Sequence, residues 1–108
     1  MQKITLFGEE LTIAFNYAVR IMFEKITDKS FDSCDFNRSE DRIALYISSI
    51  LANNKDCTIT DEKLMYDATL EDIQKLDVAV SQAISEWYHV PTPAGEDQDE
   101  QDEDKEKN

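Results

Sequence analysis

Apolar and polar positions alternate along the first fifteen residues. The apolar members of this pattern are Ile4, Leu6, Leu11, Ile13 and Phe15. A period of two is typical of half-buried β-strands, and Gly8-Glu9 separates the two runs. We predict a β-hairpin with a type II′ turn at Gly8-Glu9. This turn would pair Leu6 with Leu11 and place Ile4 and Ile13 opposite each other on the same face.

After Phe15 the apolar spacing changes to three and four residues, which indicates helices. Each predicted helix begins at a polar residue able to accept a hydrogen bond from the first-turn backbone. The predicted starts are Asn16, Ser39, Thr60 and Thr69, the last forming a capping box with Asp72. We expect the first helix to reach Thr27 and the second to end near Asn53-Asn54. The polar stretch from 28 to 38 is predicted to be a loop held by Phe31 and Phe36.

The last predicted helix carries a seam of apolar positions that steps by three and four. Its members are Ile73, Leu76, Val80, Ala83 and Trp87. Such a seam is typical of a helix that lies along another helix. Packing within the chain is the preferred interpretation, since the other helices need a surface on which to bury their own stripes. A helix contact between molecules is the alternative.

The periodic region ends at His89-Val90, because Pro91 and Pro93 cannot continue a helix. From Glu96 to Asn108 there is no apolar residue, and the segment from Pro91 onward holds eight acidic residues and two lysines. We therefore predict one compact domain over 1–90 and a disordered acidic tail over 91–108. The order of elements indicates an α+β fold, with the hairpin packed on a bundle of three to four α-helices.

The charge of the chain excludes some classes of partner. It has 24 acidic and 11 basic residues, a formal net charge of -13. Such a charge repels phosphate backbones and anionic membrane surfaces, so we expect neither a nucleic-acid nor a membrane partner. The chain also lacks an apolar run of the roughly 20 residues needed to span a bilayer, and its start has no secretion signal. A cytoplasmic location is expected.

The residues that usually carry chemistry are sparse and scattered. There is one histidine, His89, and there are two cysteines, Cys34 and Cys57, without a CxxC pair. No nucleophile motif or phosphate-binding glycine loop occurs, and the EF-hand-like spacing that starts at Asp28 has Ser33 at its glycine position. We predict a protein that is not an enzyme and has no catalytic, metal or cofactor site.

The segment from 4 to 32 resembles the start of the tail assembly chaperones of long-tailed bacteriophages and prophages. The residues that carry the resemblance are Gly8, Phe15-Asn16, Phe23-Glu24 and Thr27-Asp28-Lys29-Ser30. Asp28 stands where glycine is common in that family. The helical remainder through Trp87 agrees in length and order, but it has no diagnostic motif.

The resemblance implies a non-enzymatic helper in the host cytoplasm. It would bind the tape measure protein and keep it soluble during tail assembly, and some members of the family form homo-oligomers. We expect amphipathic helices to supply the surface that binds the protein partner. The candidate residues are Ile47, Ile50, Val80, Ile84 and Trp87. The alternatives are a structural component of the virion or tail, and an acidic protein that inhibits an enzyme by mimicking DNA.

Overall fold

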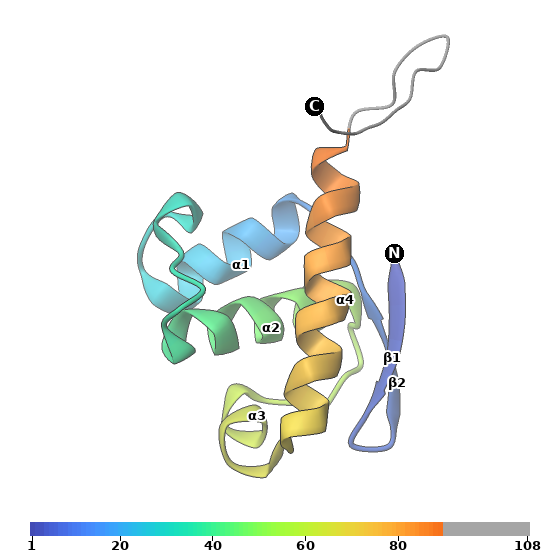
Figure 1. Ribbon diagram of the computed structural model, residues 1–108. Coiled ribbons are helices and arrows are strands. Elements are labelled where there is room, and N and C mark those ends of the chain that lie inside the picture. Colours follow the sequence, from blue (N-terminus) through green and yellow to red (C-terminus); the bar gives the residue numbers. More distant parts are fainter. Residues whose placement is uncertain (90–108) are drawn as a thin grey trace, which may run out of the picture.

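The computed structural model describes residues 1–89, which form the hairpin and helices of Figure 1. The predicted disordered tail, residues 91–108, lies outside the described residues. The chain begins with strands β1 (Gln2–Leu6) and β2 (Glu9–Ile13). Helices α1 (Tyr17–Thr27), η1 (Phe31–Ser33, a 3₁₀ turn), α2 (Ser39–Asn53), α3 (Asp61–Asp67) and α4 (Leu70–Tyr88) follow. The predicted α+β class is confirmed.

The β-hairpin forms as predicted, but its turn lies one residue earlier. Ile4 pairs with Leu11 and Leu6 with Glu9, so the turn residues are Phe7 and Gly8. Both have positive φ, 52° and 79°, as a type I′ turn requires, and this turn matches the right-handed twist of the strands. The predicted pairing of Leu6 with Leu11 was therefore wrong by two positions. Because a shift of two keeps every side chain on its face, Leu6, Leu11 and Ile13 still point into the core.

The predicted helix starts are confirmed at three of the four positions. Asn16 accepts a hydrogen bond from the Val19 N–H, and Thr60 accepts one from the Lys63 N–H. Thr69 and Asp72 form the predicted capping box. Ser39 is the exception, because it is the first residue of α2 and the capping position belongs to Arg38, whose side chain makes no capping bond. Helix boundaries of this kind commonly differ by one residue.

Helix α2 is the centre of the fold. It contacts α1, α3, α4 and β2, and every residue from Ala44 to Ile50 is buried, including Ser48 and Ser49. In Figure 1, α1 lies on one side of α4 and the hairpin lies on the other. A helix surrounded in this way needs small side chains where its neighbours approach closely, and the two serines meet this need.

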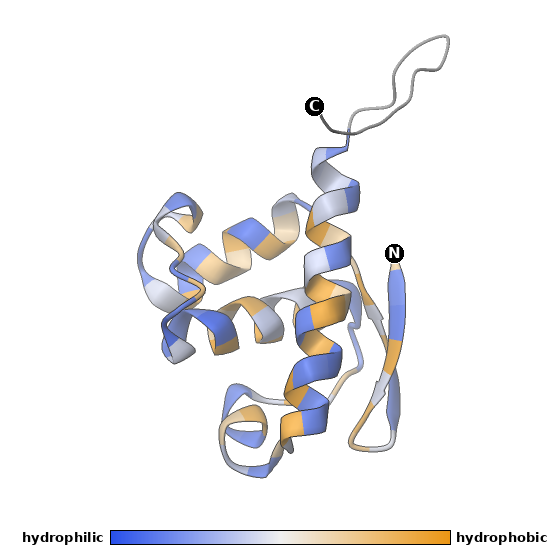
Figure 2. Cartoon of the chain, viewed as in Figure 1, coloured by the Kyte–Doolittle hydropathy of each residue, from blue (hydrophilic) through white to orange (hydrophobic). Residues whose placement is uncertain are grey.

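Helix α4 buries its predicted seam inside the molecule. Leu76, Ala79, Val80 and Ala83 are buried, and α4 contacts β1, β2 and α2. Figure 2 shows the hydrophobic positions of α4 recurring between hydrophilic ones along the helix. The interpretation of the seam as packing within the chain is therefore confirmed for its central residues.

Candidate partner-binding groove

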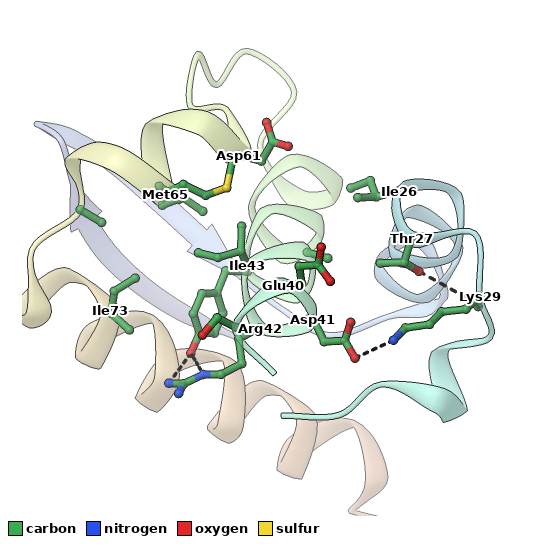
Figure 3. A pocket seen from close by; sticks show the side chains of 15 residues that line it. Ile26, Thr27, Lys29, Glu40, Asp41, Arg42, Ile43, Asp61, Met65 and Ile73 are labelled. Carbon is green, nitrogen blue, oxygen red and sulfur yellow. Dashed lines mark hydrogen bonds and ion pairs between the residues drawn. The ribbon is translucent and has the colours of Figure 1, made fainter. Parts of the chain in front are cut away.

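A large hollow in the described part of the molecule lies over the first half of α2. Helices α1 and α3 each pack on α2, but among residues 1–89 they do not contact one another. Between them lies an open groove of about 790 Å³, which we call the α1–α3 groove. Its apolar lining includes Ile26, Ile43, Ala44, Leu64, Met65 and Ile73. Figure 3 shows Ile26 and Met65 on opposite sides of Ile43.

Two short-range features hold the walls of this groove in place. Helix α1 ends at Asp28, which has the left-handed conformation (φ 58°) and donates its N–H to the Glu24 carbonyl. This is the position at which helices favour glycine. On the other wall, α3 buries Leu64 against the core and leaves Met65 52% exposed. Ile26, in the last turn of α1, is 45% exposed, so each wall presents an apolar side chain to solvent.

A buried carboxylate fixes the loop after α1 to the start of α2. Asp41 is 3% exposed. It accepts hydrogen bonds from Lys29 Nζ at 2.7 Å and from the backbone N–H of Asp35 at 2.8 Å. The hydrogen bond from Lys29, helped by that of Asp35, holds the pKa of the Asp41 carboxyl below its ordinary value of 3.8. Phe31 is buried beneath the same loop, whereas Phe36 is 51% exposed and is not the anchor that we predicted.

Asp41→Asn is expected to lower the thermal unfolding temperature at neutral pH, and this loss should become smaller on acidification. Since the pKa of Asp41 is lowered by folding, its ionised form stabilises the fold above the unfolded-state pKa of about 3.9. The stabilisation is lost as the pH falls through the lowered folded pKa. Thermal unfolding of both proteins at about pH 7 and about pH 3 measures this, with Glu40→Gln in the same helical turn as the control. An equal difference at both pH values would contradict the prediction.

A second polar cluster lies beneath the groove and joins α2 to α4. Arg42 donates to the hydroxyl of Tyr46 through Nε and Nη2, at 3.2 and 3.0 Å. Both Arg42 and the Tyr46 hydroxyl also bond the carboxylate of Asp77. Tyr46 is 2% exposed, so its polar end needs these partners. Arg42 neutralises the carboxylate of Asp77. The three side chains together fix the orientation of α4 relative to α2, which forms the floor of the groove.

The predicted partner-binding residues do not form one surface. Ile47, Ile50 and Val80 are buried in the core, so in this fold they stabilise the domain and present nothing to a partner. The reason is that neighbouring elements cover α2 from Ala44 to Ile50, while α4 turns Val80 inward with its seam. Ile84 is half-buried against the core. Only Trp87 has a large exposed surface, at 44%.

Trp87 belongs to an aromatic cluster remote from the groove. Its ring centroid lies 6.0 Å from that of Phe15 and 6.3 Å from that of Tyr17. The ring centroid of Tyr88 lies 6.1 Å from that of Phe15. Tyr17 and Tyr88 are both more than half exposed. The cluster is a second exposed apolar surface, at the end of α4.

The groove is not evident from the sequence. Ile26, Ile43 and Ile73 recur at helical spacing, which indicates only a helix face, and Met65 lies on the short helix α3. Periodicity shows which residues share a face, but it does not show that α1 and α3 stand apart. The presence of a methionine at position 65 was an available signal, because methionine is common at adaptable binding surfaces.

The groups that usually carry chemistry lie apart from one another. Burial raises the pKa of the Cys34 thiol to about 11, with nearby Asp41 acting in the same direction, so at neutral pH it is protonated and a poor nucleophile. Cys57 is also a free thiol. His89 follows the last turn of α4 and donates its N–H to the Glu86 carbonyl. Within residues 1–89, no three His, Cys, Asp or Glu side chains are grouped as metal ligands.

Comparison with known proteins gave no relatives: no protein-family model, no curated protein and no solved structure matches the chain. None of the described helices is long and apolar enough to cross a membrane. The physical description of the groove and the sequence resemblance are therefore the basis for a functional proposal.

Proposed function

We propose that the protein is a non-enzymatic tail assembly chaperone that binds an amphipathic helix of a tape measure protein in the α1–α3 groove. The observation that carries this proposal is the pair of exposed apolar side chains, Ile26 and Met65, on two walls that share the α2 floor. A helix laid between the walls would bury its apolar face against both and complete the packing around α2.

The charge of the chain supports a role in keeping such a partner in solution. With a net charge of -13, copies of a complex repel one another and so resist aggregation. The acidic side chains Glu40 and Asp61 lie at the rim of the groove. They favour a partner helix whose apolar stripe is flanked by lysine or arginine. The host cytoplasm is the location where this role would be performed.

The test is co-expression with the tape measure gene of the same phage or prophage. Wild type is expected to raise the soluble fraction of that protein. Ile26→Asp combined with Met65→Asp should abolish the effect and weaken binding at least about a hundredfold, because two apolar contacts are lost and two charges are buried. Calorimetry with a soluble tape measure fragment measures the affinity.

A matched control is available on the same two helices. Ile21 in α1 and Tyr66 in α3 are 51% and 81% exposed, and neither lines the groove. Ile21→Asp combined with Tyr66→Asp therefore adds the same charges to the same elements and should leave binding intact. Equal solubilisation by the groove variant, or none by wild type, would refute the proposal. Presence of the protein in mature particles would favour a structural component instead.

A further inference from the structure

The two edges of the hairpin differ in a way that bears on self-association. In a hairpin closed by a two-residue turn, the pair that flanks the turn, here Leu6 and Glu9, is hydrogen-bonded, and the bonded pairs then alternate along the strands. The backbone groups of Lys3 and Thr5 in β1 therefore point away from β2. Those of Glu10 and Thr12 in β2 point away from β1.

The edge formed by β2 is partly closed by a side chain. Asn54, just after α2, accepts a hydrogen bond from the Thr12 N–H at 2.9 Å and donates to the Thr12 carbonyl at 2.8 Å. Its amide thus pairs with the strand as a neighbouring strand would. Asn53 also donates to the Ala14 carbonyl at 2.9 Å. These bonds confirm the direction of the backbone groups in β2 and occupy the outward groups of Thr12, so within residues 1–89 only those of Glu10 remain unpaired on this edge.

The edge formed by β1 is open. Among the hydrogen bonds of residues 1–89, none joins the outward backbone groups of Lys3 or Thr5 to another part of the chain. A shallow groove of about 450 Å³ runs beside this edge, between Ile4 and the α4 residues Val78, Ala79 and Gln82. Val78 is 57% exposed there. An unpaired strand beside an apolar shelf is the arrangement that accepts an additional strand.

We propose that β1 pairs with β1 of a second copy of this chain, in antiparallel orientation, to give a symmetric dimer with a continuous four-stranded sheet. The register is self-complementary. With the two-fold axis at Ile4, Lys3 of each copy faces Thr5 of the other, and all the outward N–H and C=O groups of these residues find partners. Ile4 of one copy then meets Ile4 of the other on the core side, beside Val78.

The net charge of this surface is small, so it opposes the approach of a second copy less than the acidic surface elsewhere does. Although the chain carries -13 in total, the edge and its groove contain Lys3 and Lys75 against the single acid Glu71, and the other lining residues are uncharged. Two copies can therefore approach here without the repulsion that opposes contact over most of the surface. The surface is small, so we expect a weak dimer that forms as the protein concentration rises.

Sedimentation equilibrium between about 5 and 500 µM tests the proposal, starting from the 12.5 kDa chain. Wild type is expected to approach twice this mass as its concentration rises. Thr5→Pro removes an outward N–H from each copy without touching a bond of the hairpin, and it should weaken the dimer at least about thirtyfold. The control is Glu10→Pro, at the residue directly opposite Thr5, on the edge that faces away from the dimer.

Val78→Arg provides a second variant that does not alter the backbone. Because Val78 is mostly exposed, the change leaves the fold intact but places two arginines together at the dimer axis. Both Thr5→Pro and Val78→Arg should be monomeric, while Glu10→Pro should dimerise like wild type. The proposal is overturned if wild type stays monomeric over the whole concentration range. This holds even if its β1 strand is found to pair with a strand of another protein. A dimer that persists in both variants also overturns it.

The dimer does not rest on the proposed function, since its surface and the α1–α3 groove are formed by different residues. The variant Ile26→Asp with Met65→Asp should therefore dimerise normally even though it fails to bind the tape measure fragment. Far-UV circular dichroism of each variant establishes that the helices are retained.

Discussion

Phe23→Ala is expected to lower the free energy of unfolding by about 3–5 kcal/mol, the largest effect of any single truncation proposed for this protein. The Phe23 side chain is fully buried. Its ring packs edge-on against Phe31, with the centroids 5.4 Å apart, and so joins α1 to the following loop. Truncation removes this contact and leaves a cavity that the surrounding helices fill only in part. A domain of this size has a total stability of roughly 5–15 kcal/mol, so much of it would be lost.

Urea unfolding followed by circular dichroism measures this loss. Ile21→Ala, two residues earlier in the same helix, is the control, because its side chain is about half exposed. We expect the control to change the free energy of unfolding by about 0.5 kcal/mol or less, as is usual for surface positions. A loss below about 1 kcal/mol for Phe23→Ala would show that α1 does not pack on the core as described.

Asn54→Ala is expected to lower the free energy of unfolding by about 2–3 kcal/mol, although the residue lies at a helix end and not in the core. Its side chain bonds both backbone groups of Thr12 and also donates to the Ile50 carbonyl at 2.7 Å. Removing the amide leaves these three groups without partners in a partly buried place. The Thr12 amide should then exchange its hydrogen with solvent faster than the amide of its neighbour Leu11, which bonds within the hairpin.

One further variant separates the components of the Asn54 contact, and a second variant serves as its control. Asn54→Asp keeps an acceptor for the Thr12 N–H but removes the donor to the Thr12 carbonyl. Its free energy of unfolding should therefore lie between those of wild type and Asn54→Ala. Asn37→Ala, at an exposed asparagine, should be nearly neutral. Unchanged exchange of the Thr12 amide in Asn54→Ala would mean that the side chain does not close the edge of β2.

The local signals in the sequence predicted most of the fold because each depends on neighbours along the chain. The caps at Asn16, Thr60 and Thr69 need only a side chain within reach of the next turn. The alternating hairpin pattern predicted the buried face correctly, since a register error of two positions leaves that face unchanged. The turn itself was missed because a phenylalanine with positive φ is unusual.

The surface was harder to predict because it depends on distances between elements. Ile47 and Ile50 form a stripe that fits a core and an interface equally well, and the choice depends on what covers α2. Ile21 and Ile26 are the same residue type on the same helix, α1, but only Ile26 lines the groove between α1 and α3. Phe36, by contrast, is apolar and mostly exposed, because the loop is fixed by the Lys29–Asp41 contact instead.

The amide of Asn54 also limits how far the protein can polymerise. A sheet with two open edges adds copies without end and leads to fibres. Here the β1 edges of two copies would be consumed by pairing with each other. The outer strands of the resulting sheet would both be β2, each partly closed by its own Asn54. One side chain, remote from the dimer axis, would thereby favour an assembly that stops at two.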